Sequence, residues 1–206
     1  MDPQPSVWRS SLEEFSRQLA EGDGITGAVA VAAISAAFAV SVLRMVLAVT
    51  TRKRGSESQL IPLQVAAKTL SHDLCAAADE DRAAYAAYRQ ASRLPRTTEH
   101  ERAERDRTMR ASLEKATETP LRAAQSALGA IMLCSQAAPL VRGAVAADIG
   151  GAAEILHGAL RAILNSVDAN LRAIGDEKLR AERQELEERA TRYLGEVRDR
   201  LRTQTH

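Results

Sequence analysis

One stretch near the amino terminus limits what this chain can fold into. From Ile25 to Leu43 it reads ITGAVAVAAISAAFAVSVL, without a single charged side chain. Its length is close to the ~20 residues that a membrane-spanning helix needs. However, alanine is only weakly apolar, Arg44 interrupts the apolar continuation, and the mean hydropathy of the whole chain is −0.24. Small residues also let a helix pack closely against several neighbours. We therefore interpret the stretch as the buried central helix of a soluble bundle that does not enter a membrane, with a membrane span as the alternative.

The remaining sequence predicts an all-α fold made of one domain that spans residues 1–206. Ala, Leu, Arg and Glu, which favour helices, dominate, and no run alternates as a strand would. The apolar periodicity and the breakers predict about six helices with short connections, as in an antiparallel bundle. They are a short helix capped by Ser10 or Ser11, the Ala-rich helix, a helix from about Leu60 to Arg93, a charged helix after LPRTT that Pro120 kinks or splits, a helix ending near Ile174 and a last helix opened by GDE.

Charge and cysteine usage exclude several classes of function. The chain carries 28 basic and 27 acidic side chains, for a net charge of +1, so no basic surplus favours a nucleic-acid partner. The two cysteines, Cys75 and Cys134, are far apart, and we expect buried free thiols in a cytoplasmic protein. The four histidines show no paired spacing, so we expect no metal site. The first residues lack the pattern of a signal peptide.

A carboxylate lies off-pattern on the third predicted helix. At 100° per residue, Asp81 falls in the middle of the apolar face, whereas Asp79 points to the opposite side and Glu80 to a flank. The apolar face consists of Leu70, Leu74, Ala77, Ala84, Tyr85 and Tyr88. A carboxylate directed at a core costs several kcal/mol unless it is paired or protonated. Asp81 is thus either bonded to a neighbouring helix or an arginine such as Arg44, or a general acid–base that also pairs with a cationic substrate.

The fifth predicted helix carries a flank of small polar residues beside its apolar face. Asp148, Ser166 and Asn170 share this flank, and Asp148 and Ser166 are separated by five whole turns. The apolar face consists of Ile149, Ala153, Leu156, Leu160, Leu164, Val167 and Leu171. The polar flank is either a small-residue helix contact with Asp148 as N-cap, or the wall of a polar cleft between helices.

Several segments together resemble the cyclodeaminase/methenyltetrahydrofolate cyclohydrolase family, which includes the C-terminal domain of formiminotransferase-cyclodeaminase. The segments are SLEEFSRQLA, DEDRAAYAAYRQASRLP, KATETPLRAAQSA and RGAVAADIGGAAEILHGALRAILNSVDANLRAIGD, in the family's order over nearly the whole chain. The resemblance implies a helical homodimer that acts on one-carbon units of a tetrahydrofolate derivative, as substrate rather than tightly bound cofactor. It implies Asp81 as the catalytic residue. The substrate-binding residues that it implies are Gly27, Lys53, Tyr85, Asp148, Ser166 and Asn170.

The sequence departs from the family pattern at the entry to the Ala-rich helix. Where the family has several glycines in a row, Gly27 is followed by Ala28 and Val29. Glycines there let a ligand approach the backbone N–H groups of the helix start, and added side chains narrow that approach. Two alternatives therefore stand beside the folate enzyme. One is a repurposed enzyme for C–N cyclisation or ring opening of a non-folate substrate, and the other is a non-catalytic helical dimer.

Overall fold

The computed structural model describes residues 6–22, 27–54 and 59–203, and within them every regular element is a helix. This confirms the all-α prediction. The elements are η1 (Val7–Arg9), α1 (Leu12–Glu21), α2 (Ala28–Arg54), α3 (Leu60–Ser92), α4 (Glu99–Ala137), η2 (Ala138–Leu140), α5 (Val145–Ile174) and α6 (Glu177–Arg202). The predicted helices appear in the predicted order, and their observed ends lie close to the expected ones.

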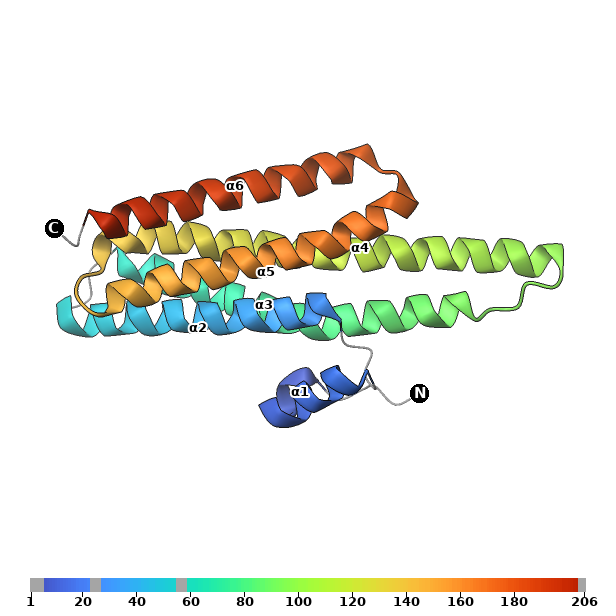
Figure 1. The fold of residues 1–206 in the computed structure, drawn as a ribbon, viewed down its shortest axis with the longest axis horizontal. Coiled ribbons are helices and arrows are strands. Elements are labelled where there is room, and N and C mark those ends of the chain that lie inside the picture. Colours follow the sequence, from blue (N-terminus) through green and yellow to red (C-terminus); the bar gives the residue numbers. More distant parts are fainter. Residues whose placement is uncertain (1–5, 23–26, 55–58, 204–206) are drawn as a thin grey trace.

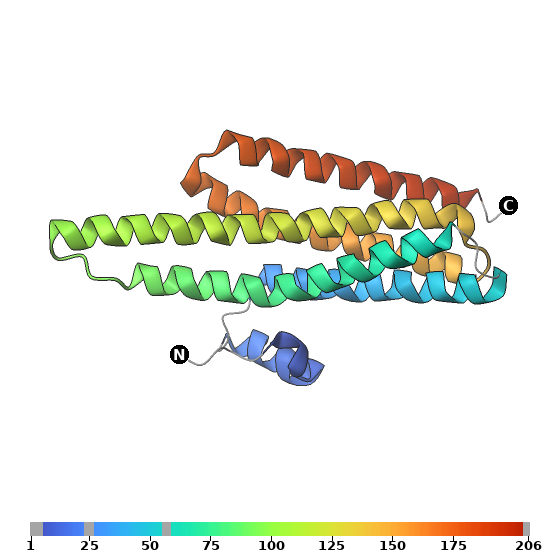
Figure 2. The same ribbon diagram turned by 180° about the vertical axis from the view of Figure 1, so that it is seen from behind.

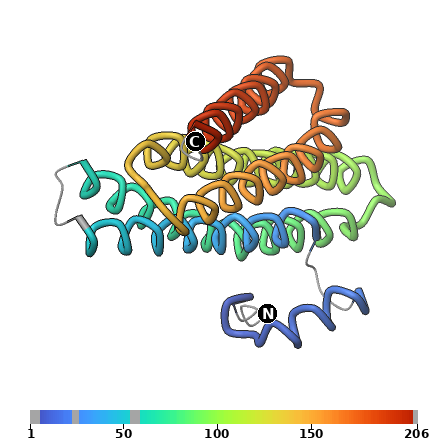
Figure 3. The backbone as a smooth tube through the Cα atoms, turned by 60° about the vertical axis from the view of Figure 1, so that its left-hand side comes forward, coloured from blue at the N-terminus to red at the C-terminus, as the bar shows by residue number. Residues whose placement is uncertain are grey.

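Helices α2, α3, α4 and α5 form an antiparallel four-helix core (Figure 1). Each of them packs on two neighbours, in the order α2, α3, α4, α5 and back to α2, and α6 covers the groove between α4 and α5. Seen from behind, the α3–α4 hairpin extends beyond the ends of α2 and α6 (Figure 2). Helix α1 lies apart from the core, beside α2 and α3 (Figure 3).

Local capping chemistry explains where several helices begin and end. The Ser11 hydroxyl accepts a hydrogen bond from the backbone N–H of Glu14, so Ser11 rather than Ser10 caps α1. Gly22 ends α1 with a left-handed φ of 68°. Thr98 starts α4 with a reciprocal capping box, and Asp176 caps α6 by accepting two backbone N–H groups.

Helix α2 is long and apolar enough to cross a bilayer by length and composition alone. An 18-residue window within Ala28–Lys53 has a mean hydropathy of 2.2, but 56% of this window is buried inside the fold. Ala33, Ala36 and Val40 have no exposed surface, since α3 and α5 pack against them. This burial is typical of a core helix and favours the soluble interpretation. Ile25, at the start of the uncharged stretch, lies outside the described residues.

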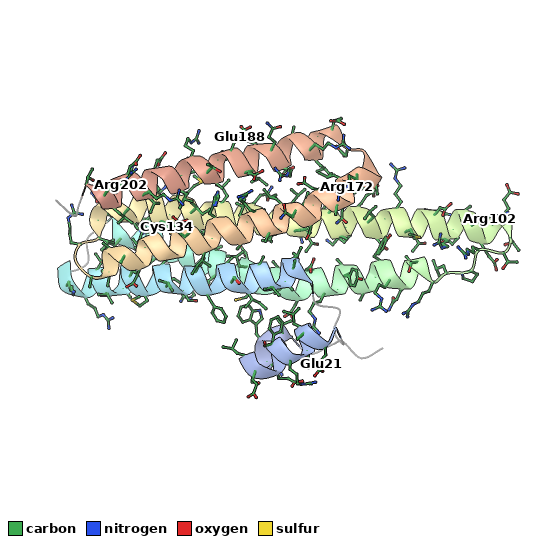
Figure 4. All side chains as sticks on the ribbon, in the orientation of Figure 1. Glu21, Arg102, Cys134, Arg172, Glu188 and Arg202 are labelled. Carbon is green, nitrogen blue, oxygen red and sulfur yellow. The ribbon has the colours of Figure 1, made fainter. Side chains whose placement is uncertain are left out.

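Three details differ from the sequence-based expectations. Pro120 does not split the charged helix, because α4 continues through it to Ala137. Asp148 is not an N-cap, since α5 begins at Val145 and Asp148 lies exposed in its first turn. Cys75 is only half-buried, whereas Cys134 is fully buried and burial raises its pKa to about 12. Figure 4 shows Cys134 inside the bundle and Glu188 on the outer face of α6.

Candidate functional site

Three consecutive acidic residues in the middle of α3 have three different environments. Asp79 accepts a hydrogen bond from the Ser6 hydroxyl (2.5 Å) and another from the backbone N–H of Val7 (2.9 Å). These two bonds hold η1 against α3. Glu80 forms an ion pair with Arg122 of α4 at 2.7 Å. Asp81 instead faces a cavity. The predicted divergence of the three side chains is therefore confirmed, and only Asp81 remains available for chemistry.

Among the described residues, no counter-charge lies close to the carboxylate of Asp81. Within residues 6–22, 27–54 and 59–203, it takes part in no hydrogen bond or ion pair, and Arg44 is exposed on α2. The hypothesis that Arg44 pairs with Asp81 is therefore wrong. Burial raises the pKa of Asp81 from 3.8 to about 6, because the half-buried site solvates the charged form poorly. A carboxyl group with a pKa close to neutral can both accept and return a proton.

The cavity in front of Asp81 has a volume of about 450 Å³. It lies between the start of α2, the second half of α3, the middle of α4 and the second half of α5. Its lining consists of Gly27, Ala28, Val29, Asp81, Tyr85, Tyr88, Leu113, Ala116, Ser166, Ala169, Asn170 and Ala173. The volume falls within the range of small-molecule sites, which is roughly 300–1,000 Å³.

The structure brings five of the seven predicted site residues together at this cavity. They are Gly27, Asp81, Tyr85, Ser166 and Asn170. Lys53 lies at the opposite end of α2, about 39 Å along the helix axis from Gly27 at the rise per residue of an α-helix. Asp148 lies about 27 Å along α5 from Ser166. Neither Lys53 nor Asp148 lines the cavity of its own chain.

Sequence reasoning did not assign several residues of the lining to the site. Tyr88 lies two turns after Asp81 on the same face of α3, so helical spacing contained the signal for it. Leu113 and Ala116 come from α4, which reaches the cavity only through tertiary packing. No local pattern identifies such residues, because their neighbours across the bundle are distant in sequence.

The lining supplies one carboxylate, two phenols, a hydroxyl and an amide within a largely apolar wall. No lysine or arginine lines the cavity among the described residues. The start of α2 also lies at the cavity, and the first backbone N–H groups of a helix have no intrahelical partner. Residues in the described ranges form no group of three or more metal-ligating side chains. The arrangement therefore suits proton transfer at a neutral or cationic centre of a small molecule.

An antiparallel helical bundle with a half-buried carboxylate in a cleft between four helices defines the class of this protein. A family model described as formiminotransferase-cyclodeaminase matches residues 11–189. The chain belongs to this family. The fold is similar to that of a formiminotetrahydrofolate cyclodeaminase from Thermotoga maritima, with a TM-score of 0.78, 23% sequence identity and 96% of each chain covered. At this identity the similarity shows the fold alone. No curated protein matches the sequence.

Proposed function

We propose that this chain is an enzyme that makes or breaks a C–N bond at a cationic, amidine-like carbon. The observation that carries the proposal is the Asp81 carboxylate, which lines the cavity with a pKa raised to about 6. Membership of the formiminotransferase-cyclodeaminase family supports it. The substrate class that fits both is a one-carbon unit on tetrahydrofolate. The reaction is closure of the formimino form with loss of ammonia, or hydrolysis of the methenyl form, which makes the enzyme a lyase or a hydrolase.

The proton balance of the closure gives Asp81 two consecutive roles. The second folate nitrogen attacks the formimino carbon, and a tetrahedral centre forms that carries an amino group. Asp81 takes the proton from the attacking nitrogen as a general base. It then returns that proton to the amino group, which leaves as ammonia while the C–N double bond of the methenyl cation forms. The substrate carries one positive charge at the start and the methenyl product carries one at the end. Between the two proton transfers the tetrahedral intermediate and Asp81 are both neutral, so the ionised carboxylate stabilises the cation before the first transfer and after the second.

The other lining residues shape the cavity for a flat ring system. Tyr85 and Tyr88 follow Asp81 at one and two turns, and their rings present faces and polar hydroxyl groups to a ligand. Leu113 and the alanines of α5 form an apolar wall across the cavity. Gly27 and the start of α2 offer backbone N–H groups to a ligand oxygen.

We further propose that the protein is a cytoplasmic homodimer. An apolar strip on the α2–α3 surface supports a dimer, because Phe38, Met45, Ile61 and Val65 are between 42% and 62% exposed. Exposed apolar patches are typical of interaction surfaces. Lys53 is far from its own cavity, so if it binds substrate, as the resemblance implies, it does so in the cavity of a second copy. A sizing column run without detergent tests both the dimer and the absence of a membrane requirement, and a monomer or an insoluble chain refutes this part.

One observation favours a second candidate, an enzyme of the same chemistry with a non-folate substrate. Folates carry carboxylates, yet no basic side chain of the described residues lines the cavity. Ala28 and Val29 also add side chains where a ligand approaches the start of α2. Binding of a folate and of a pterin without the glutamate tail distinguishes the candidates. Tight binding of the folate favours the first, and failure of both favours the second.

Turnover of formiminotetrahydrofolate tests the proposal directly. The account predicts that ammonia release and the absorbance of the methenyl product rise together in equal amounts. Asp106→Asn, on the exposed surface of α4, is the matched control for Asp81→Asn and leaves the rate unchanged. The folate assignment is refuted if the folded protein binds no folate and turns over neither the formimino nor the methenyl form. The non-folate enzyme and the non-catalytic dimer then remain as the two alternatives.

A further inference from the structure

Pro120 removes one hydrogen-bond donor from the interior of α4. Proline has no backbone N–H, so the carbonyl of the residue four positions earlier, Ala116, loses its intrahelical partner. The side-chain amide of Asn170 on α5 replaces that partner, because its Nδ2 donates to the Ala116 oxygen at 3.0 Å. Pro120 is buried, and both Ala116 and Asn170 line the cavity beside Asp81. The Ala116 carbonyl of α4, which Pro120 leaves without a backbone donor, is thus hydrogen-bonded by Asn170 of α5.

This hydrogen bond determines the orientation of the Asn170 amide and thereby which of its two ends remains available to a ligand. The reversed amide places Oδ1 against the Ala116 oxygen, and two acceptors at hydrogen-bond distance repel each other. In the observed orientation, Oδ1 accepts no hydrogen bond from the described residues and is not sealed from solvent. We infer that Pro120 is a positioning residue that holds Asn170 as a permanent hydrogen-bond acceptor in the cavity, so that Asp81 and Asn170 together select a ligand group that donates N–H bonds.

The selectivity follows from the chemistry of the two groups, and this part rests on the proposed function. An ionised carboxylate and an amide oxygen both accept hydrogen bonds, and neither donates. A formimino group presents a cationic NH₂ at the position where a formyl group of the same shape presents a carbonyl oxygen. A formyl oxygen placed between Asp81 and Asn170 meets two acceptors and stays unpaired at that position, and loss of a matched polar contact costs binding. The cavity therefore prefers the formimino compound to the formyl compound.

A double-mutant cycle tests the fixed amide without any ligand. In the wild-type background, Asn170→Ala leaves the Ala116 carbonyl without a donor, and we expect the folding equilibrium constant to fall about tenfold. In the Pro120→Ala background, the new N–H of residue 120 reaches that carbonyl, so the same change is expected to cost about threefold or less. Two controls match these changes: Asn165→Ala on the exposed face of α5, and Pro62→Ala in the first turn of α3.

The binding of two ligands tests the selectivity. We expect wild-type protein to bind 5-formiminotetrahydrofolate at least about tenfold more tightly than 5-formyltetrahydrofolate. In Pro120→Ala the amide is free to turn, so it can donate to the formyl oxygen and the ratio is expected to fall about threefold or more. Pro62→Ala keeps the wild-type ratio. A purely structural role of Pro120 changes stability but not this ratio.

Each outcome decides a separate statement. Equal costs of Asn170→Ala in both backgrounds overturn the fixed amide, whatever binds in the cavity. The cost of Asn170→Ala can instead differ between the two backgrounds while the ratio of formimino to formyl affinity stays unchanged in Pro120→Ala. This result overturns the selectivity and leaves the proposed function intact. If neither folate binds to wild-type protein, the proposed function fails together with the selectivity that rests on it, while the cycle still decides the fixed amide. Should Pro120→Ala not fold, Pro120→Val takes its place, because it restores the same N–H and fills more of the buried volume.

Discussion

Replacing Asp81 with asparagine is expected to change the pH dependence of stability. Folding raises the pKa of Asp81 from 3.8 to about 6, so the folded chain binds more protons than the unfolded chain between these values. The free energy of unfolding therefore falls as the pH rises through this window, and the loss is complete above it. A difference of roughly two pKa units corresponds to about 3 kcal/mol. The ionised carboxylate thus costs the fold about 3 kcal/mol at neutral pH.

Asp81→Asn removes the charge and keeps the shape of the side chain. Below about pH 3 the carboxyl is mostly protonated in both the folded and the unfolded chain, so the stability difference between wild type and variant does not involve the charge. Near pH 8 the wild-type fold is destabilised by its ionised Asp81, whereas the neutral asparagine of the variant has no such cost. Its stability relative to wild type should therefore rise by roughly 2 to 3 kcal/mol between these two pH values.

Urea unfolding of both proteins over this pH range measures the difference. Asp106→Asn is the control, since that side chain is 76% exposed and water solvates its charge in the folded and the unfolded chain. Its stability difference should change by less than about 0.5 kcal/mol over the same range. The stability difference between Asp81→Asn and wild type can instead be as independent of pH as that of the control. In that case Asp81 does not lie in a poorly solvating site, and its proposed role in proton transfer is refuted.

Three further predictions concern other parts of the chain. Asp79→Ala should release η1 from α3, which shifts the fluorescence of the single tryptophan, Trp8, to longer wavelength; an unchanged spectrum contradicts this role. Arg183→Gln should lower the free energy of unfolding by about 1 to 2 kcal/mol, because it removes the ion pair with Asp168 of α5 and the ion pair with Glu187 within α6; a loss below about 0.3 kcal/mol in urea unfolding opposes it. Gly27→Ala should leave stability within about 0.5 kcal/mol, since no atom of the described residues, apart from the adjoining residues of the chain, lies within 4 Å of the added methyl group. The change should nevertheless weaken ligand binding at the cavity. Gly151→Ala, equally unhindered and remote from the cavity, is its control, and equal ligand affinities for both variants argue against a ligand at the α2 start.

The sequence predicted the fold well because the signals for helices are local. Ser11, Thr98 and Asp176 accept hydrogen bonds at the starts of their helices, and Gly22 ends α1, as short-range capping rules require. The apolar face of α5 is buried along its length, since burial follows a period of 3.6 residues. The effect of Pro120 was not predictable locally. Helix α4 remains intact because a side chain from α5 replaces the missing donor.

The candidate site was predictable where one helix carried the signal. Asp81 was identified from its place on an apolar face, and the cavity at that place agrees with this reasoning. Its partners on other helices depend on how the bundle aligns them. Ser166 and Asn170 align with Asp81, whereas Asp148, on the same flank of α5, lies five turns away from the cavity. Helical periodicity predicts which face of its own helix a residue occupies, but not which residues of a neighbouring helix lie beside it.

The pH dependence of formiminotetrahydrofolate closure by wild type and Asp81→Asn tests the central claim most directly. If Asp81 transfers the proton, the wild-type rate should fall below a pKa near 6, as the carboxylate becomes protonated. The variant should lose this limb and turn over about 10²- to 10⁴-fold more slowly at neutral pH, the usual contribution of a general acid–base. A folded Asp81→Asn protein that keeps the wild-type rate and the wild-type pH profile contradicts the account.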